Sequence, residues 1–181
     1  MTEKEYQSEI QKLNLKQLKR FWNKKQPGWD AGKVFEYSII RAFELDGATV
    51  TYPYCVSNSA GVFEQIDGAI HLDNLSVLVE SKNYGKKKAL DIEPLAKLQV
   101  RLLRRPASVI GCIFSTSCFT WPAQLLVDTL EPKTILLWDK EDIEDCFKNG
   151  HFVKVLLEKY RCAIERGDHF FKPVALKKIK I

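Results

Sequence analysis

Apolar residues recur at helical spacing in several parts of the chain. In residues 5–23, for example, Ile10, Leu13 and Leu18 form an apolar stripe in a polar background, which predicts one helix or two short ones. Asp30 is a suitable N-cap for the next helix, and Asp46-Gly47 provides its end. The same reasoning predicts further helices at residues 31–45, 90–105, 121–130, 140–148 and 152–166.

Runs rich in β-branched and apolar residues lie between these helices. They predict strands at residues 49–56, 63–72, 76–82, 108–116 and 134–138. The turn signal Asp73-Asn74 joins the second and third strands, so these two should form a hairpin. An order of helix, three strands and then alternating helices and strands predicts an α/β fold with helices on both faces of a mixed sheet.

Composition places the chain among globular proteins with one core. It has 181 residues, of which 45% are hydrophobic and 28% charged. No signal-peptide pattern and no apolar run of membrane-spanning length occurs, so we expect no membrane association. The five cysteines form no CxxC pair, which argues against a disulfide framework or structural zinc and favours a cytoplasmic location with reduced thiols.

An acid and a lysine stand two residues apart at the end of the otherwise apolar run SVLVESK, residues 76–82. Because side chains alternate across a strand, Glu80 and Lys82 share one face with Leu78. Taken alone, such a tripeptide is more often a surface ion pair than a site. Charges rarely enter buried strands without a partner or a task, so the pair is a candidate site.

Two further carboxylates are candidates for the same site. Asp67 lies in the middle of the predicted strand 63–72, and the hairpin should return it to the region of Glu80. Glu36 shares a helical row with Ile40 and Phe43, so it is either buried at a cost or faces a polar cleft. Carboxylates that converge beside an ammonium group form the hard-oxygen site that Mg²⁺ prefers.

Basic residues follow the candidate strand closely. The net charge is only +5, but the positive side chains cluster on a helical stripe and on the loop before it, and such a cluster suits a polyanion, although it could also be a solvated helix face. The candidate nucleic-acid contacts are Lys86, Lys87, Lys88, Lys97, Arg101 and Arg104.

Three strings together resemble the PD-(D/E)xK nuclease superfamily. GKVFE (32–36), QIDGAI (65–70) and VESK (79–82) resemble motifs of Mrr-like restriction endonucleases, and ESKNYG (80–85) is similar to the signature of nuclease-related (NERD-like) domains. The resemblance covers about residues 31–116, with Ile66 in place of the usual proline. It implies a restriction-endonuclease-like core at residues 31–138 of a single domain, with helical extensions at 1–28 and 139–181.

The resemblance also implies an activity. Asp67, Glu80 and Glu36 would hold Mg²⁺, with Mn²⁺ as a substitute, and Lys82 would contact the phosphate and help take a proton as its pKa falls. Gln99 resembles a polar residue near such sites, although a core-edge amide is the alternative. The expected function is a Mg²⁺-dependent endonuclease acting on DNA, in restriction or foreign-DNA defence.

Other interpretations stay open. The chain could instead be a structure-selective nuclease, of the Holliday-junction resolvase or repair type, or a non-catalytic DNA-binding module of the same fold. With no separate recognition domain in view, it could cut with little specificity, act as a homodimer or depend on a partner protein for specificity.

Overall fold

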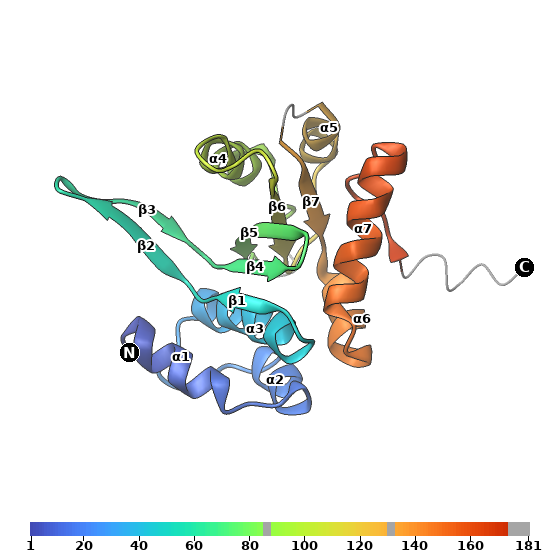
Figure 1. Ribbon diagram of the computed structural model, residues 1–181. Helices are drawn as coiled ribbons and strands as arrows, with labels where there is room; N and C mark the ends of the chain where they lie inside the picture. The colour runs from blue at the N-terminus through green and yellow to red at the C-terminus, as the bar shows by residue number, and fades with distance from the viewer. Residues whose placement is uncertain (85–87, 130–132, 174–181) are drawn as a thin grey trace, which may run out of the picture.

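The computed structural model describes residues 1–84, 88–129 and 133–173 (Figure 1). Within these ranges, the main sheet has five strands. In spatial order they are β1 (Thr49–Thr51), β4 (Ala69–Leu72), β5 (Leu75–Lys82), β6 (Val109–Ser115) and β7 (Ile135–Trp138). The pairs β1–β4 and β4–β5 are antiparallel, whereas β5–β6 and β6–β7 are parallel, so the sheet is mixed.

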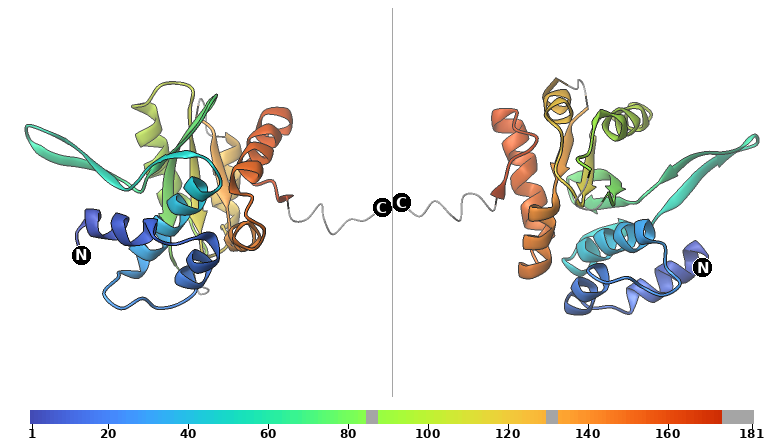
Figure 2. Two further views of the ribbon diagram at one scale, coloured as in Figure 1. Left: turned by 60° about the horizontal axis from the view of Figure 1, so that its bottom comes forward. Right: turned by 180° about the vertical axis from the view of Figure 1, so that it is seen from behind.

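Helices cover both faces of this sheet (Figures 1 and 2). The helices of the described ranges are α1 (Glu3–Gln11), α2 (Leu15–Trp22), α3 (Ala31–Leu45), α4 (Ile92–Leu103), α5 (Trp121–Thr129), α6 (Lys140–Asn149) and α7 (Phe152–Arg166). One apolar cluster joins one face of the sheet to α1, α2, α3, α6 and α7, and a second cluster joins the other face to α4 and α5. The predicted mixed sheet between helices, with extra helices at both ends, is confirmed.

Successive side chains of the central strand β5 belong alternately to the two apolar clusters. Val77 and Val79 belong to the cluster that contains α3, whereas Leu78 packs with Leu95 and Leu98 of α4. Glu80 and Lys82 follow Leu78 at two-residue spacing and therefore face the α4 layer. The strand that carries the candidate pair is thus fixed from both sides before its charged end begins.

Two predicted strands are broken in the structure, which corrects the sequence analysis. The run 49–56 divides at Pro53 into β1 and β2 (Tyr54–Asn58), and the run 63–72 divides at Asp67-Gly68 into β3 (Gly61–Ile66) and β4. Proline cannot donate a ladder hydrogen bond, and Gly68 takes a φ of 144°, outside the strand range. As a result, β2 and β3 pair with each other in a separate hairpin that projects from the body next to α4 (Figures 1 and 2).

The terminal helices share their core with the central region. Ile10 of α1, Leu18 of α2 and Leu156 of α7 are all fully buried in the same cluster as Phe43 of α3. The first predicted helical region forms two helices, α1 and α2, and the bounds predicted for α3 and α7 are confirmed. Across the described part of the chain, no helix combines the length and the apolar character needed to cross a bilayer.

Candidate active site

The break between β3 and β4 places Asp67 against the charged end of β5. Asp67 Oδ2 accepts a hydrogen bond from the backbone N–H of Ser81 at 2.8 Å, and Ser81 lies between Glu80 and Lys82. Gly68 makes this approach feasible, because a Cβ there would lie 2.4 Å from Ile40 Cδ1. The aspartate and the glutamate–lysine pair therefore meet at one point of the sheet.

Both oxygens of Glu80 are bound to cations. Lys82 Nζ lies 2.5 Å from Glu80 Oε1, and Arg101 Nη1 of α4 donates a hydrogen bond to Glu80 Oε2. The Glu80 side chain is only 4% exposed, and a buried carboxylate needs such partners to remain charged. Arg101, a candidate nucleic-acid contact from the sequence, reaches into the site in this structure.

Glu36 approaches from the opposite layer, at the N-terminal end of α3. Asn83, just beyond β5, ties this end of α3 to the sheet, because its Nδ2 donates to Ala31 O at 2.9 Å and its Oδ1 accepts from Thr116 Oγ1 at 3.0 Å. Glu36 itself accepts a hydrogen bond from Lys33 Nζ at 2.9 Å. The hydrogen bonds of Asn83 therefore fix where α3 presents Glu36.

The pKa of Asp67 reflects its burial and the acids near it. Burial and the nearby carboxylates of Glu80 and Glu36 raise the pKa of Asp67 to about 7, although the Ser81 N–H and Lys82 oppose the rise. Burial and repulsion between carboxylates both disfavour the charged form of an acid and so raise its pKa. Glu80 and Glu36 thus both lie within electrostatic reach of Asp67.

Lys82 is the ammonium group of the candidate site. Burial lowers the pKa of its ammonium group, but the carboxylates of Glu80 and Asp67 outweigh burial and hold the pKa above its ordinary value. Lys82 is therefore held as a positive charge in this arrangement, whereas the expected fall of its pKa concerns the site with a metal ion bound. An ammonium ion of this kind can bind a phosphate oxygen directly.

The carboxylates fit a magnesium ion by donor type but are not arranged around one. Among the described residues, no three His, Cys, Asp or Glu side chains lie close enough together to hold a metal ion. Mg²⁺ takes one or two carboxylates and keeps several waters, so Asp67 and Glu80 could supply its protein ligands. Glu80 would first have to release Arg101 or Lys82.

Glu64 is a buried charge that the sequence analysis did not single out. Its side chain is 2% exposed, and its oxygens lie 2.8 Å from Arg104 and 2.7 Å from Arg105, with Arg101 at 3.8 Å. Burial raises the pKa of Glu64, but the two nearest guanidinium groups outweigh this and hold it below its ordinary value. Its position could have identified it, because Glu64 lies two residues before Ile66 in a strand and so shares a face with it, and Ile66 is fully buried.

The remaining predicted residues are spread over α4 and the loop before it. Gln99 lies about 160° around α4 from Arg101, so the arginine rather than the glutamine faces Glu80. Lys97 is exposed and pairs with Glu93 at 2.7 Å. Lys88 is exposed, with its Nζ 5.3 Å from the centre of the Tyr84 ring, and Lys86 and Lys87 lie outside the described residues.

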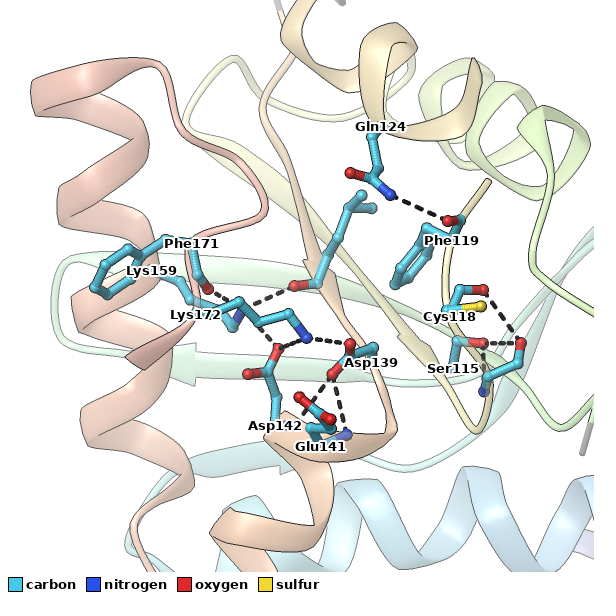
Figure 3. Close-up of polar contacts among 12 residues, drawn as sticks. Ser115, Cys118, Phe119, Gln124, Asp139, Glu141, Asp142, Lys159, Phe171 and Lys172 are labelled. Atoms are coloured by element: carbon cyan, nitrogen blue, oxygen red, sulfur yellow. Dashed lines mark hydrogen bonds and ion pairs between the residues drawn. The ribbon is translucent and has the colours of Figure 1, made fainter. Parts of the chain in front are cut away.

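A second buried ion pair lies beyond β7, away from these residues (Figure 3). Lys159 of α7 is fully buried, pairs with Asp142 Oδ2 at 2.8 Å and donates hydrogen bonds to Leu137 O at 2.9 Å and Phe171 O at 2.6 Å. Burial lowers the pKa of Lys159 and raises that of Asp142. Because these contacts join α6, α7, β7 and the segment after α7, we assign the pair a structural role.

Among comparisons with known proteins, only the comparison of structures found similar proteins. No protein-family model matches the chain, and no curated protein sequence matches it. Among solved structures, it is similar to the MspJI restriction endonuclease in complex with a 27-mer oligonucleotide, with 19% identity over 99% of this chain and 42% of that chain, and a TM-score of 0.46. For the DNA modification-dependent restriction endonuclease AspBHI, the identity is 16% over 90% of this chain and 43% of that chain, with a TM-score of 0.45.

A third solved structure is similar over most of its own length. The small subunit of a heterodimeric restriction endonuclease shares 13% identity over 91% of this chain and 86% of that chain, with a TM-score of 0.47. The chain thus spans less than half of MspJI and AspBHI but most of this subunit. At identities of 13–19% and TM-scores of 0.45–0.47, this likeness carries no functional conclusion, and the function has to be inferred from the site itself.

Proposed function

We propose that this chain is a divalent-metal-dependent nuclease that hydrolyses phosphodiester bonds in DNA. One observation carries the proposal: Asp67, in the break between β3 and β4, accepts its hydrogen bond from the residue between Glu80 and Lys82 of β5, so two acids and an amine meet at one point. Two carboxylates beside an amine are the side chains that a metal-assisted phosphodiester hydrolysis would use. The raised pKa of Asp67 supports it, because repelling carboxylates are stabilised by a cation.

The roles of the side chains follow from their positions. Asp67 and Glu80 would be the metal ligands, and Glu36 would bind through water because it approaches from the other layer. When bound, Mg²⁺ supplies polarisation of the scissile phosphate and stabilisation of its developing charge. Lys82 holds a phosphate oxygen with its ammonium group, and Arg101 becomes a second cation for the phosphate once it leaves Glu80.

The experiment is a cleavage assay with matched variants. Supercoiled plasmid and labelled oligonucleotides are incubated with purified protein and Mg²⁺ or Mn²⁺, with and without a chelator. We expect metal-dependent cleavage that Asp67→Ala and Lys82→Ala abolish, while Lys12→Ala, which changes an exposed lysine of the helical N-terminal region, retains it. Cleavage that survives Asp67→Ala would come from a contaminant and would count against the proposal.

Inactivity on both DNA and RNA with either metal would favour the non-catalytic DNA-binding module. The arrangement of Glu80 gives this second function a physical basis, because two cations already occupy its oxygens. A gel-shift assay in chelator separates the two functions: a binding module retains DNA affinity without any metal-dependent product.

A further inference from the structure

A groove of about 500 Å³ lies between the projecting hairpin and α4. Figure 1 shows β3 leaving the body beside this helix. The groove's lining includes aromatic, amide, aliphatic and basic side chains: Phe63, Gln65, Lys97, Val100, Arg101 and Arg104. It ends at the candidate active site, because Arg101 is also the partner of Glu80.

The walls of this groove expose apolar surface that the fold does not use. Phe63 on the hairpin is 51% exposed and Val100 on α4 is 58% exposed. The guanidinium carbon of Arg104 lies 5.5 Å from the centre of the Phe63 ring. An exposed ring with a guanidinium against it offers a stacking surface to the face of a nucleobase.

The charges along the groove favour an anionic strand. Lys97 and Arg104 point into solvent, with side chains 62% and 48% exposed. Glu93 also lines the groove but is paired with Lys97, and Glu64 is enclosed by Arg104 and Arg105. A phosphate can therefore replace Glu93 beside Lys97 in a weak, solvent-exposed ion pair. If Arg104 turns to a phosphate, the buried Glu64 keeps Arg105 as its partner.

We infer that this groove binds an unpaired nucleotide of the substrate strand, with its base stacked on Phe63 and its phosphates on Arg104 and Lys97. In a duplex each base face is covered by its neighbours, so only a single-stranded or opened segment can present a base to the ring. The inference rests on the proposed nuclease function and narrows its substrate to nucleic acid with a single-stranded segment at the cut.

Binding measured without metal tests the groove separately from catalysis. Fluorescence anisotropy in chelator compares an unstructured labelled DNA strand with a blunt duplex of the same sequence, for the wild type and for Phe63→Ala, Phe63→Trp and Val62→Ala. Val62 is the matched control, because it is 66% exposed on the same hairpin but does not line the groove.

We expect Phe63→Ala to weaken single-strand binding about tenfold, as the loss of one base–aromatic stack should, and to leave duplex binding unchanged. Phe63→Trp should retain the wild-type affinity and Val62→Ala should change neither. Equal losses on both DNAs, or no loss on the single strand, would overturn the inference. A wild-type dimer that Phe63→Ala converts to a monomer in light scattering would also overturn it, since the ring would then be a subunit contact.

The proposed function fails on a different result. If the wild type shows no metal-dependent cleavage but Phe63→Ala loses single-strand affinity, the groove is a binding site on a non-catalytic module. If the wild type cleaves but Phe63→Ala binds both DNAs as before, only the groove assignment is lost.

Discussion

Arg101 of α4 donates a hydrogen bond to Glu80 of β5 across the interface between the helix and the sheet. The same guanidinium lies 3.8 Å from Glu64 of β3, so it stands between two buried carboxylates. Glu64 is already neutralised by two other arginines, whereas Glu80 has only Lys82 besides Arg101 among the described residues. Arg101 therefore occupies one of the two oxygens of Glu80 that a metal ion could take, and Lys82 occupies the other.

Removal of this cation should strengthen metal binding. We expect Arg101→Gln to bind Mg²⁺ or Ca²⁺ about tenfold more tightly, because the ion no longer displaces a guanidinium from Glu80 and no longer meets its charge. Isothermal titration calorimetry measures the affinity without any turnover. Lys97→Gln is the control, since this lysine lies on the same helix but pairs with the exposed Glu93. Unchanged metal affinity in Arg101→Gln would show that Arg101 does not compete.

Asp67 should make the metal-free protein less stable as the pH rises. Its folded pKa of about 7 lies above the ordinary value of 3.8, so the folded state binds more protons and stability falls between these two pH values. Asp67→Asn, which keeps an acceptor for Ser81, should raise the free energy of unfolding by on the order of 2 kcal/mol above about pH 7.5 and change it little near pH 4.

Urea unfolding in chelator at the two pH values measures this effect. Glu9→Gln is the control, because Glu9 is exposed and pairs only with Lys12 among the described residues. A stabilisation by Asp67→Asn that is equal at both pH values, or a loss of stability at the higher one, would contradict the prediction. Saturating Mg²⁺ should narrow the difference between wild type and variant at alkaline pH.

Gly68 should tolerate no side chain. Its φ of 144° is unfavourable for other residues, and a Cβ would meet Ile40 at 2.4 Å and the carbonyl oxygen of Thr51 at 3.0 Å. We expect Gly68→Ala to lower the free energy of unfolding by about 3 kcal/mol through strain and overpacking. Gly47→Ala shares the positive φ but has open space around it, so it should cost only about 1 kcal/mol. Equal losses in denaturant titrations would show that the contact with Ile40 is unimportant.

Removal of one partner of the buried pair Lys159–Asp142 should destabilise the fold strongly, whereas removal of both partners should destabilise it much less. Lys159→Met leaves a buried carboxylate without its nearest cation, so we expect a loss of about 3–5 kcal/mol. The double variant Lys159→Met, Asp142→Leu should recover most of that loss, because neither charge then remains. Thermal and urea unfolding measure both. A double variant no more stable than the single one would mean that the hydrogen bonds from Lys159 to Leu137 and Phe171 dominate.

Local sequence patterns predicted which candidate residues share a face and where the helix that carries Glu36 begins and ends. The alternation in residues 76–82 placed Glu80 and Lys82 on one face of a strand, and the helix 31–45 was bounded by its capping residue and the following turn. These predictions held because strand alternation and helix capping depend on residues within a few positions of one another. The prediction of one continuous strand at residues 63–72 was wrong, because the sequence does not show whether a strand breaks at a glycine: Gly68 permits the break but does not require it.

Only the tertiary structure decided which charges meet. The sequence placed Lys97, Arg101 and Arg104 on one stripe of α4, but the packing of Leu95, Leu98 and Leu102 against the sheet set the helix rotation that brings Arg101 to Glu80. Likewise, β3 had to leave the main sheet before Glu64 could reach the arginines. Pairings between segments far apart in the chain depend on how whole layers pack, and spacing along the sequence does not encode that geometry.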